Sequence, residues 1–102
     1  MLESFTIATF ALRIGESFLI RITDAQTIEL TLSTARELTP HTIPTTDMIT
    51  RIPFSLLFLG PSELGLSQGT YRLEHAQLGI FDLFIVPVGV QGDQMQYEAV
   101  FT

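Results

Sequence analysis

Two segments of the chain are apolar on both sides of an extended backbone, and this feature constrains the fold more than any other. Residues 52–60, with the sequence IPFSLLFLG, place phenylalanine or leucine at both alternating sets of positions. Residues 80–88, IFDLFIVPV, are built in the same way around one carboxylate, Asp82. Successive side chains of a strand point to opposite faces of its sheet. Both faces of these two strands therefore need cover, which a single open sheet does not provide.

Four other segments show the apolar–polar alternation of half-buried strands, namely residues 16–23, 27–33, 70–75 and 95–101. The short turn at residues 24–26 predicts that the first two of these form a hairpin, and a glycine-rich loop at residues 89–93 precedes the last. Six short strands separated by turns indicate an all-β, six-stranded antiparallel barrel or sandwich.

The N-terminal region has a different spacing of apolar residues. Between Ser4 and Gly15 they recur mostly at intervals of three and four, which predicts one short N-terminal helix that ends at Gly15. The β-branched residues of this stretch leave a strand or an irregular lid as the alternative. The proline- and threonine-rich segment from Glu37 to Arg51 has no sustained period and is predicted to be a long loop.

Composition bounds the size of the fold and the choice of partner. The chain has 102 residues, the size of one compact domain, so we expect a single β domain over residues 1–102. Five arginines, no lysine and eleven acidic residues give a formal charge of -6. That balance repels phosphate backbones and argues against nucleic acid as a partner. The absence of cysteine excludes disulfides and thiolate metal sites.

Hydropathy gives no indication of a membrane anchor or an export signal. No segment approaches the roughly 18 uninterrupted apolar residues of a membrane span, so we expect no transmembrane segment. The N-terminus carries Glu3 and lacks the basic and apolar regions of a secretory signal. The compartment stays open: cytoplasmic by default, or part of an extracellular or phage-like assembly.

One pentapeptide matches the nucleophile elbow of serine hydrolases. Residues 65–69 have the sequence GLSQG, with Ser67 at the centre. That chemistry needs a strand before the serine and a helix after it, and it needs a histidine that follows the acid in the chain. Here turn residues precede Ser67, a predicted strand follows it, and His75 comes before Asp82. We interpret the motif as a glycine loop between strands.

A second constellation combines Glu74 and His75 with Asp82 or Glu98. Adjacent strand residues point to opposite faces, so Glu74 and His75 do not line one pocket without a bulge. The other histidine, His41, lies in the predicted loop. We expect His75 to end its strand and bind the following turn, and Arg72 to pair across strands with Asp82 or Glu98. No catalytic, cofactor-binding or metal-binding residue is predicted, and the chain is not expected to be an enzyme.

Four strings of the sequence resemble a family of bacterial proteins of about one hundred residues and unknown function. They are PFSLLFLGP at residues 53–61, QGTYRLEH at 68–75, LFIVPVG at 83–89 and YEAVF at 97–101. The resemblance extends to Phe10, Gly15 and Phe18, and so covers nearly the whole chain. It implies no catalytic or cofactor residues. It also implies a weak contextual link to phage-tail-collar-like proteins.

The apolar strands and the low charge together favour assembly over chemistry. Exposed leucine or phenylalanine side chains cost about 1.5 to 3 kcal/mol each relative to burial. We therefore predict a non-catalytic structural or interaction module that associates with itself or with another protein, for example in a phage-tail-like or filamentous assembly. The alternative is a small barrel that binds an apolar ligand at a mouth closed by the loop at residues 37–51. The candidate interface residues are Phe54, Leu57, Leu59, Arg72, Glu74, Phe81, Leu83 and Ile85.

Overall fold

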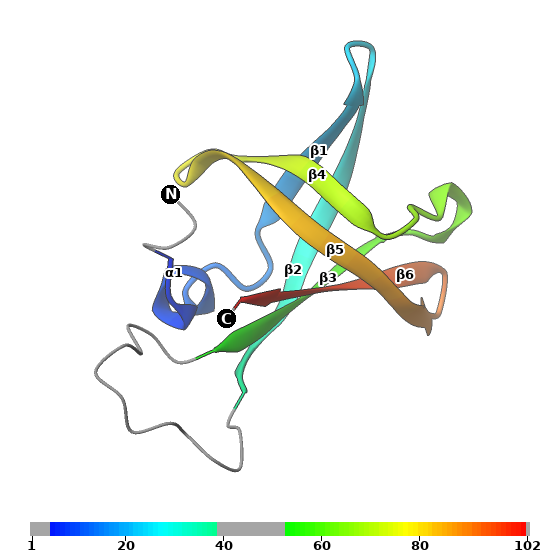
Figure 1. Ribbon diagram of the computed structural model, residues 1–102. Helices are drawn as coiled ribbons and strands as arrows, with labels where there is room; N and C mark the ends of the chain where they lie inside the picture. Colours follow the sequence, from blue (N-terminus) through cyan, green and yellow to red (C-terminus); the bar gives the residue numbers. More distant parts are fainter. Residues whose placement is uncertain (1–4, 39–52, 102) are drawn as a thin grey trace.

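The computed structural model describes residues 5–38 and 53–101 and contains one short helix and six strands (Figure 1). The elements are α1 (Ile7–Ala11), β1 (Ser17–Thr23), β2 (Gln26–Glu37), β3 (Phe54–Pro61), the 3-10 helix η2 (Ser62–Leu64), β4 (Gly69–His75), β5 (Gly79–Gln91) and β6 (Gln94–Phe101). All six predicted strands are present, and β2 and β5 are longer than predicted. The predicted loop at residues 37–51 lies mostly outside the described residues.

The six strands close into an antiparallel barrel in the order β1-β2-β3-β6-β5-β4. The prediction of an all-β barrel with one short N-terminal helix is confirmed, and the sandwich alternative is not needed. β1 and β2 form the predicted hairpin, with Phe18 opposite Leu30 and Ile20 opposite Ile28. A closed barrel covers one face of each apolar strand, because that face lies inside, and every strand has a neighbour on both sides in the closed order.

The two long strands turn the corners of the barrel. The first half of β2 pairs with β1, and its second half pairs with β3 from Thr31 onward, with a register shift between Leu32 and Thr34. In the same way β5 pairs with β4 up to Ile85 and with β6 from Val86 onward. The wall therefore consists of a β3–β6 sheet and a β1–β4 sheet, which share β2 and β5 as their outer strands.

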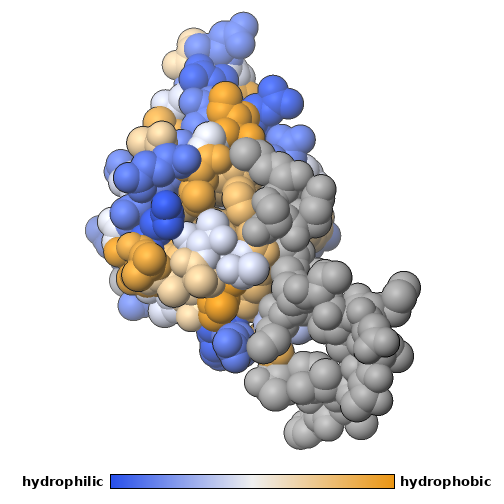
Figure 2. Space-filling model, turned by 90° about the vertical axis from the view of Figure 1, so that its left-hand side faces the viewer, coloured by the Kyte–Doolittle hydropathy of each residue, from blue (hydrophilic) through white to orange (hydrophobic). Residues whose placement is uncertain are grey.

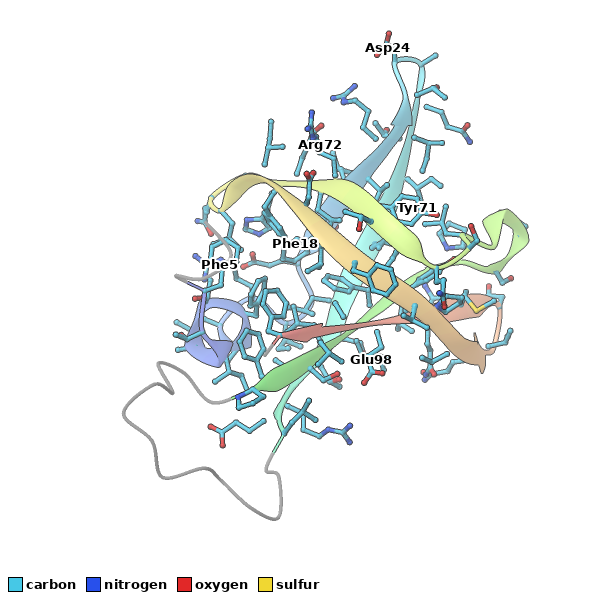
Figure 3. The ribbon with its side chains drawn as sticks, in the orientation of Figure 1. Phe5, Phe18, Asp24, Tyr71, Arg72 and Glu98 are labelled. Atoms are coloured by element: carbon cyan, nitrogen blue, oxygen red, sulfur yellow. The ribbon has the colours of Figure 1, made fainter. Side chains whose placement is uncertain are left out.

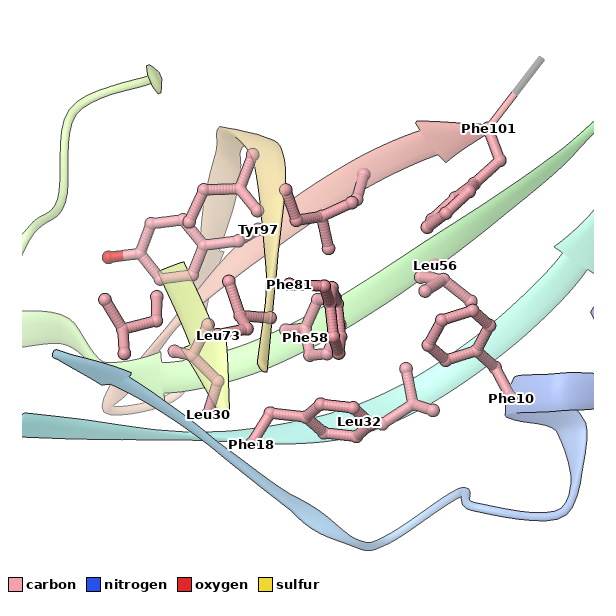
Figure 4. Close-up of a cluster of buried hydrophobic side chains, with 14 of the residues drawn as sticks. Phe10, Phe18, Leu30, Leu32, Leu56, Phe58, Leu73, Phe81, Tyr97 and Phe101 are labelled. Atoms are coloured by element: carbon pink, nitrogen blue, oxygen red, sulfur yellow. The ribbon is translucent and has the colours of Figure 1, made fainter. Parts of the chain in front are cut away.

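The inward side chains fill the barrel. Every strand contributes buried residues, and aromatic rings lie along the centre (Figure 4). Phe18 packs edge-on against Phe58 at a centroid distance of 5.4 Å, and Phe54 stacks on Phe101 at 4.5 Å. Burying a phenylalanine contributes about 1.5 to 3 kcal/mol, so this interior is the main source of stability.

α1 closes one end of the barrel and is shorter than predicted. Phe10 on α1 is fully buried and contacts the rings of Phe54 and Phe101, and Phe5 packs edge-on against Phe81. The predicted short N-terminal helix is present, with Thr6 as its N-cap, but it ends at Ala11 and not at Gly15, because the chain turns after Ala11. Gly15 has a φ of +90°, which favours glycine, and its N–H donates to the carbonyl of Leu32 (2.8 Å).

The segment between β3 and β4 covers the opposite end. The N–H of Leu66 donates to the Tyr97 hydroxyl (2.8 Å), and the Leu66 side chain packs against the core. Gly60 near the end of β3 permits Leu30 to pack closely against the backbone, because a Cβ there would lie 2.5 Å from Cδ2 of Leu30. With α1 at the other end, the interior is covered by side chains of the same chain at both openings.

Candidate interaction surface

Half of the predicted interface residues lie inside the barrel. Phe81 and Leu83 are 5% and 4% exposed, and Phe54 and Ile85 are fully buried. A partner cannot contact these four side chains while the barrel is closed, so the structure removes them from the candidate interface. The sequence analysis identified both faces of β3 and β5 as apolar but did not determine which face points inward.

Arg72 and Glu74, two others of the predicted set, are on the outer surface of β4. Nε of Arg72 lies 3.4 Å from Oδ1 of Asp82, which is one of the pairings predicted from sequence. Glu74 instead accepts from Nε of Arg21 on β1 at 2.9 Å. The hydrogen bond to Glu74, with a Coulombic contribution from the same carboxylate, raises the pKa of Arg21 above its ordinary value. Both pairs are exposed, and pairs of this kind stabilise a protein weakly.

Leu57 and Leu59, the remaining two, point outward from β3 on the wall that β3 forms with β6. We call this surface the β3–β6 face. It consists of the outward side chains of β3, β6 and the adjoining halves of β2 and β5. Its apolar members are Leu57, Leu59, Val86, Val88 and Val100. Val88 and Val100 are 48% and 52% exposed, and the other three are partly buried. Phe84, which is 51% exposed, lies opposite Thr70 on the half of β5 that pairs with β4, and so belongs to the other wall.

The polar centre of the β3–β6 face is internally hydrogen-bonded. The hydroxyl of Ser55 on β3 donates to Oε2 of Glu98 on β6 at 2.7 Å. Glu98 opposes Leu57 on one side and Val86 on the other. Arg36 lies at the β2 edge of the face, opposite Ser55. Glu98 and Arg36 have opposite signs, and the carboxylates of Glu29, Glu63 and Asp93 line a groove beside Leu59 at one end of the face.

The opposite wall of the barrel, which we call the β1–β4 face, has a different chemistry. Its outward side chains include five charged residues that alternate with Leu19 and Ile80, namely Arg21, Glu29, Arg72, Glu74 and Asp82. Arg72 and Glu98 mark the two walls in Figure 3. On the side that carries α1, apolar side chains occur in separate groups between polar ones (Figure 2). The β3–β6 face is therefore the outer wall with the fewest charges.

One polar residue in each apolar strand, Ser55 on β3 and Asp82 on β5, indicates which face of that strand points outward. Asp82 is exposed, so Ile80 and Phe84, at even spacing from it on β5, also point outward. On β3, Ser55 has the same parity as Leu57 and Leu59. One polar side chain in an apolar strand thus marks its outer face, and this signal was available before the structure.

The side chains of His75 and Glu16 are within hydrogen-bond distance and have a structural role. Nδ1 of His75 accepts from the N–H groups of Gln77 and Leu78, both at 3.1 Å, as predicted for a histidine that binds the following turn. A neutral ring then carries its proton on Nε2, which lies 2.7 Å from Oε1 of Glu16. The pair ties the β4–β5 turn to the start of β1. His41 lies outside the described residues, and the described part of the chain has no group of three or more ligands that could hold a metal ion.

The serine of the GLSQG motif lies in an exposed loop. Ser67 follows η2 and precedes β4, so the strand–serine–helix arrangement of a nucleophile elbow is absent from this described segment. Its carbonyl accepts a hydrogen bond from the Tyr71 hydroxyl at 2.8 Å. This contact fixes the loop against β4, in agreement with the interpretation of the motif as a glycine loop.

Two grooves on the outer surface are lined by described residues. One, of about 410 Å³, lies between β2 and the ends of β3 and β6 and contains the carboxylates of Glu29, Glu63 and Asp93. The other, of about 360 Å³, lies where β1 and β4 separate. Continuing the β1–β4 register past Ile20 and Leu73 would place Arg21 opposite Arg72. Like charges directly opposite destabilise a strand pair, which accounts for the separation at this point.

Comparison with protein families places the chain in a known group. A family model described as a domain of unknown function, DUF6916, matches residues 5–101. The chain belongs to this family. The resemblance inferred from the four sequence strings is thereby confirmed at the level of a family of unknown function. No curated protein and no solved structure matches the chain. Among the described residues, no helix is long and apolar enough to cross a membrane.

Proposed function

We propose that this DUF6916 protein is a non-catalytic interaction module that assembles with copies of itself. The observation that carries the proposal is the β3–β6 face, a largely uncharged outer wall with half-exposed valines. The largest apolar patch of a monomer is often functional, and patches rimmed by polar residues are typical of protein-binding surfaces. The proposal keeps the assembly role predicted from sequence and moves it from the buried strand residues to this outer face.

The polar clusters of the described residues have structural roles that support a non-catalytic protein. His75 is held between Glu16 and the β4–β5 turn, and Ser55 donates to Glu98 within the wall. Ser55 is 5% exposed, and the contacts of His75 are a carboxylate and two backbone N–H groups, so neither cluster offers an accessible nucleophile beside a general base. A subunit of a filament or of a phage-tail-like assembly is a more specific version, and it is supported by the family resemblance alone.

The alternative, an apolar ligand inside the barrel, has less support. Phe18, Phe58 and Leu73 are fully buried in the space where such a ligand would bind, and α1 covers one opening. A ligand would have to displace these side chains, at a cost comparable to that of creating a cavity.

Sedimentation velocity of the full chain over about 5 to 500 µM tests the proposed function, since weak interfaces associate in this range. We expect the mean mass to rise from the monomer value of 11.4 kDa with concentration. A monomer at every concentration would contradict self-assembly. A monomer that carries a co-purified apolar molecule would favour the ligand-binding alternative.

A further inference from the structure

We infer that the open edge of β2 over residues 26–30 binds an extended, basic segment of another protein as an additional strand. The segment occupies the groove between β2 and the ends of β3 and β6. Such a partner is distinct from the second copy of the proposed function, and its binding does not depend on self-assembly.

The first half of β2 has a hydrogen-bonded neighbour on one side. Residues 26–30 pair with β1, whereas the pairing of β2 with β3 starts at Thr31, opposite Leu59. Continuing that register would set Glu29 opposite Pro61, which has no N–H to donate. β3 instead continues with β6 alone up to Pro61 and diverges from β2 (Figure 1). The proline thus ends the β2–β3 ladder and leaves one edge of the β1–β2 hairpin open.

This open edge directs backbone hydrogen-bonding groups into the groove. The N–H of Leu32 donates to the carbonyl of Glu16, on the side of β1, at 3.0 Å. Successive residues of a strand direct these groups to alternate sides, so those of Ile28 also face β1. The N–H and C=O groups of Thr27 and Glu29 face the groove. A strand edge of this kind is the template on which an extended peptide adds a strand.

The side chains that line the groove indicate the chemistry of the added strand. The carboxylates are those of Glu29, Glu63 and Asp93, all three exposed. None of the three forms an ion pair with a described residue. Ile28, whose side chain points into the barrel, lines the same groove. An added strand with basic side chains outside and apolar side chains inside therefore fits, since its successive side chains point to opposite faces.

Charge selects a partner other than a second copy. Edge-to-edge pairing of two copies would bring two sets of these carboxylates together, on chains that each have a formal charge of -6. Like charges on paired strands are destabilising, whereas opposite charges stabilise the pair. The groove where β1 and β4 separate provides the contrast, because Arg21 and Arg72 line it and balance its carboxylates. The groove beside β2 is therefore the one that fits a basic strand.

The length of the open edge predicts weak, reversible binding. Five strand residues span about 17 Å, so an added strand pairs over about five residues. Few backbone hydrogen bonds form over that length, and each has a small net effect in water. We therefore expect a dissociation constant of about 0.1 to 1 mM for a peptide of five residues.

Amide exchange of the full chain with the peptide acetyl-KVKVK-amide tests the edge, with the protein at about 50 µM in nuclear magnetic resonance. Without peptide, the amides of Thr27 and Glu29 should exchange at least about tenfold faster than that of Ile28. Saturating peptide should slow exchange at Thr27 and Glu29 at least about fivefold, because the added strand accepts their hydrogen bonds. Equal protection of all three amides in the free protein would overturn the inference. A peptide that binds without slowing exchange at Thr27 and Glu29 adheres by charge alone, and would also overturn it.

Neutralising substitutions test the groove against general attraction to an acidic chain. Glu63→Gln and Asp93→Asn each remove one carboxylate from the groove and should weaken peptide binding at least about threefold. Asp82→Asn, on the other wall, changes the net charge equally and should alter binding less than about 1.5-fold. Circular dichroism confirms that each variant is folded. Equal losses in the three variants, or no binding at about 5 mM peptide, would overturn the inference. Sedimentation of the chain without peptide tests self-assembly separately, so either proposal can fail while the other stands.

Discussion

Leu83 and Phe84 are neighbours on β5, and the structure places their side chains on opposite sides of the barrel wall. Leu83 is 4% exposed and lies among the core side chains, whereas Phe84 is 51% exposed. Replacing Leu83 by alanine leaves a cavity in a closed interior, so Leu83→Ala should lower the free energy of unfolding by about 2 to 5 kcal/mol. Phe84→Ala removes a larger side chain that is only half buried, and should cost about 1 kcal/mol.

Equilibrium unfolding in urea, followed by far-ultraviolet circular dichroism, measures both values. The protein concentration should be about 2 µM, where weak self-association contributes nothing to stability. For a domain of this size the two variants should differ in melting temperature by about 5 °C or more. Equal losses for the two variants, or a larger loss for Phe84→Ala, would show that β5 has its opposite face toward the core. The assignment of the outer wall would then fail.

Three further substitutions test contacts that close the barrel. Gly60→Ala places a Cβ against the fully buried Leu30 and should cost about 1 to 3 kcal/mol in urea unfolding; a neutral result would mean that the core is looser than described. Tyr97→Phe removes the acceptor of the Leu66 N–H and should cost about 1 kcal/mol, with faster amide exchange at Leu66 as its signature. His75→Phe deprives two turn N–H groups of their acceptor and should cost about 1 to 3 kcal/mol; unchanged stability would show that water replaces the imidazole without loss.

The strands could be predicted from the sequence because their signals are local. Alternation identified four of them, and the two segments apolar on both faces, which became β3 and β5, correctly required a closed or doubly covered sheet. The same apolar character concealed the direction of β3 and β5. A strand without alternation does not state which face is inside, so Phe54, Phe81, Leu83 and Ile85 were placed at an interface when they belong to the core.

Contacts between distant segments were beyond the reach of the sequence. Glu16 and His75 are separated by 59 positions, and Ser55 and Glu98 by 43. Such pairs depend on strand order, which local periodicity does not encode. The end of the short helix was predicted too late for a related reason. The three- and four-residue spacing of apolar residues continues to Ile14. Phe10, however, packs against Phe101 at the end of the barrel, and the chain turns toward β1 after Ala11.

We propose that copies of this closed barrel meet through the β3–β6 face. Amide chemical shifts of the isotopically labelled full chain, recorded from about 10 to 500 µM, test it most directly because they report contact residue by residue. We expect concentration-dependent shifts at Leu57, Val86 and Val100, with Ile80 and Leu12 unchanged. Shifts that are constant over the whole range, or that change around Ile80 and not around Val100, would contradict it.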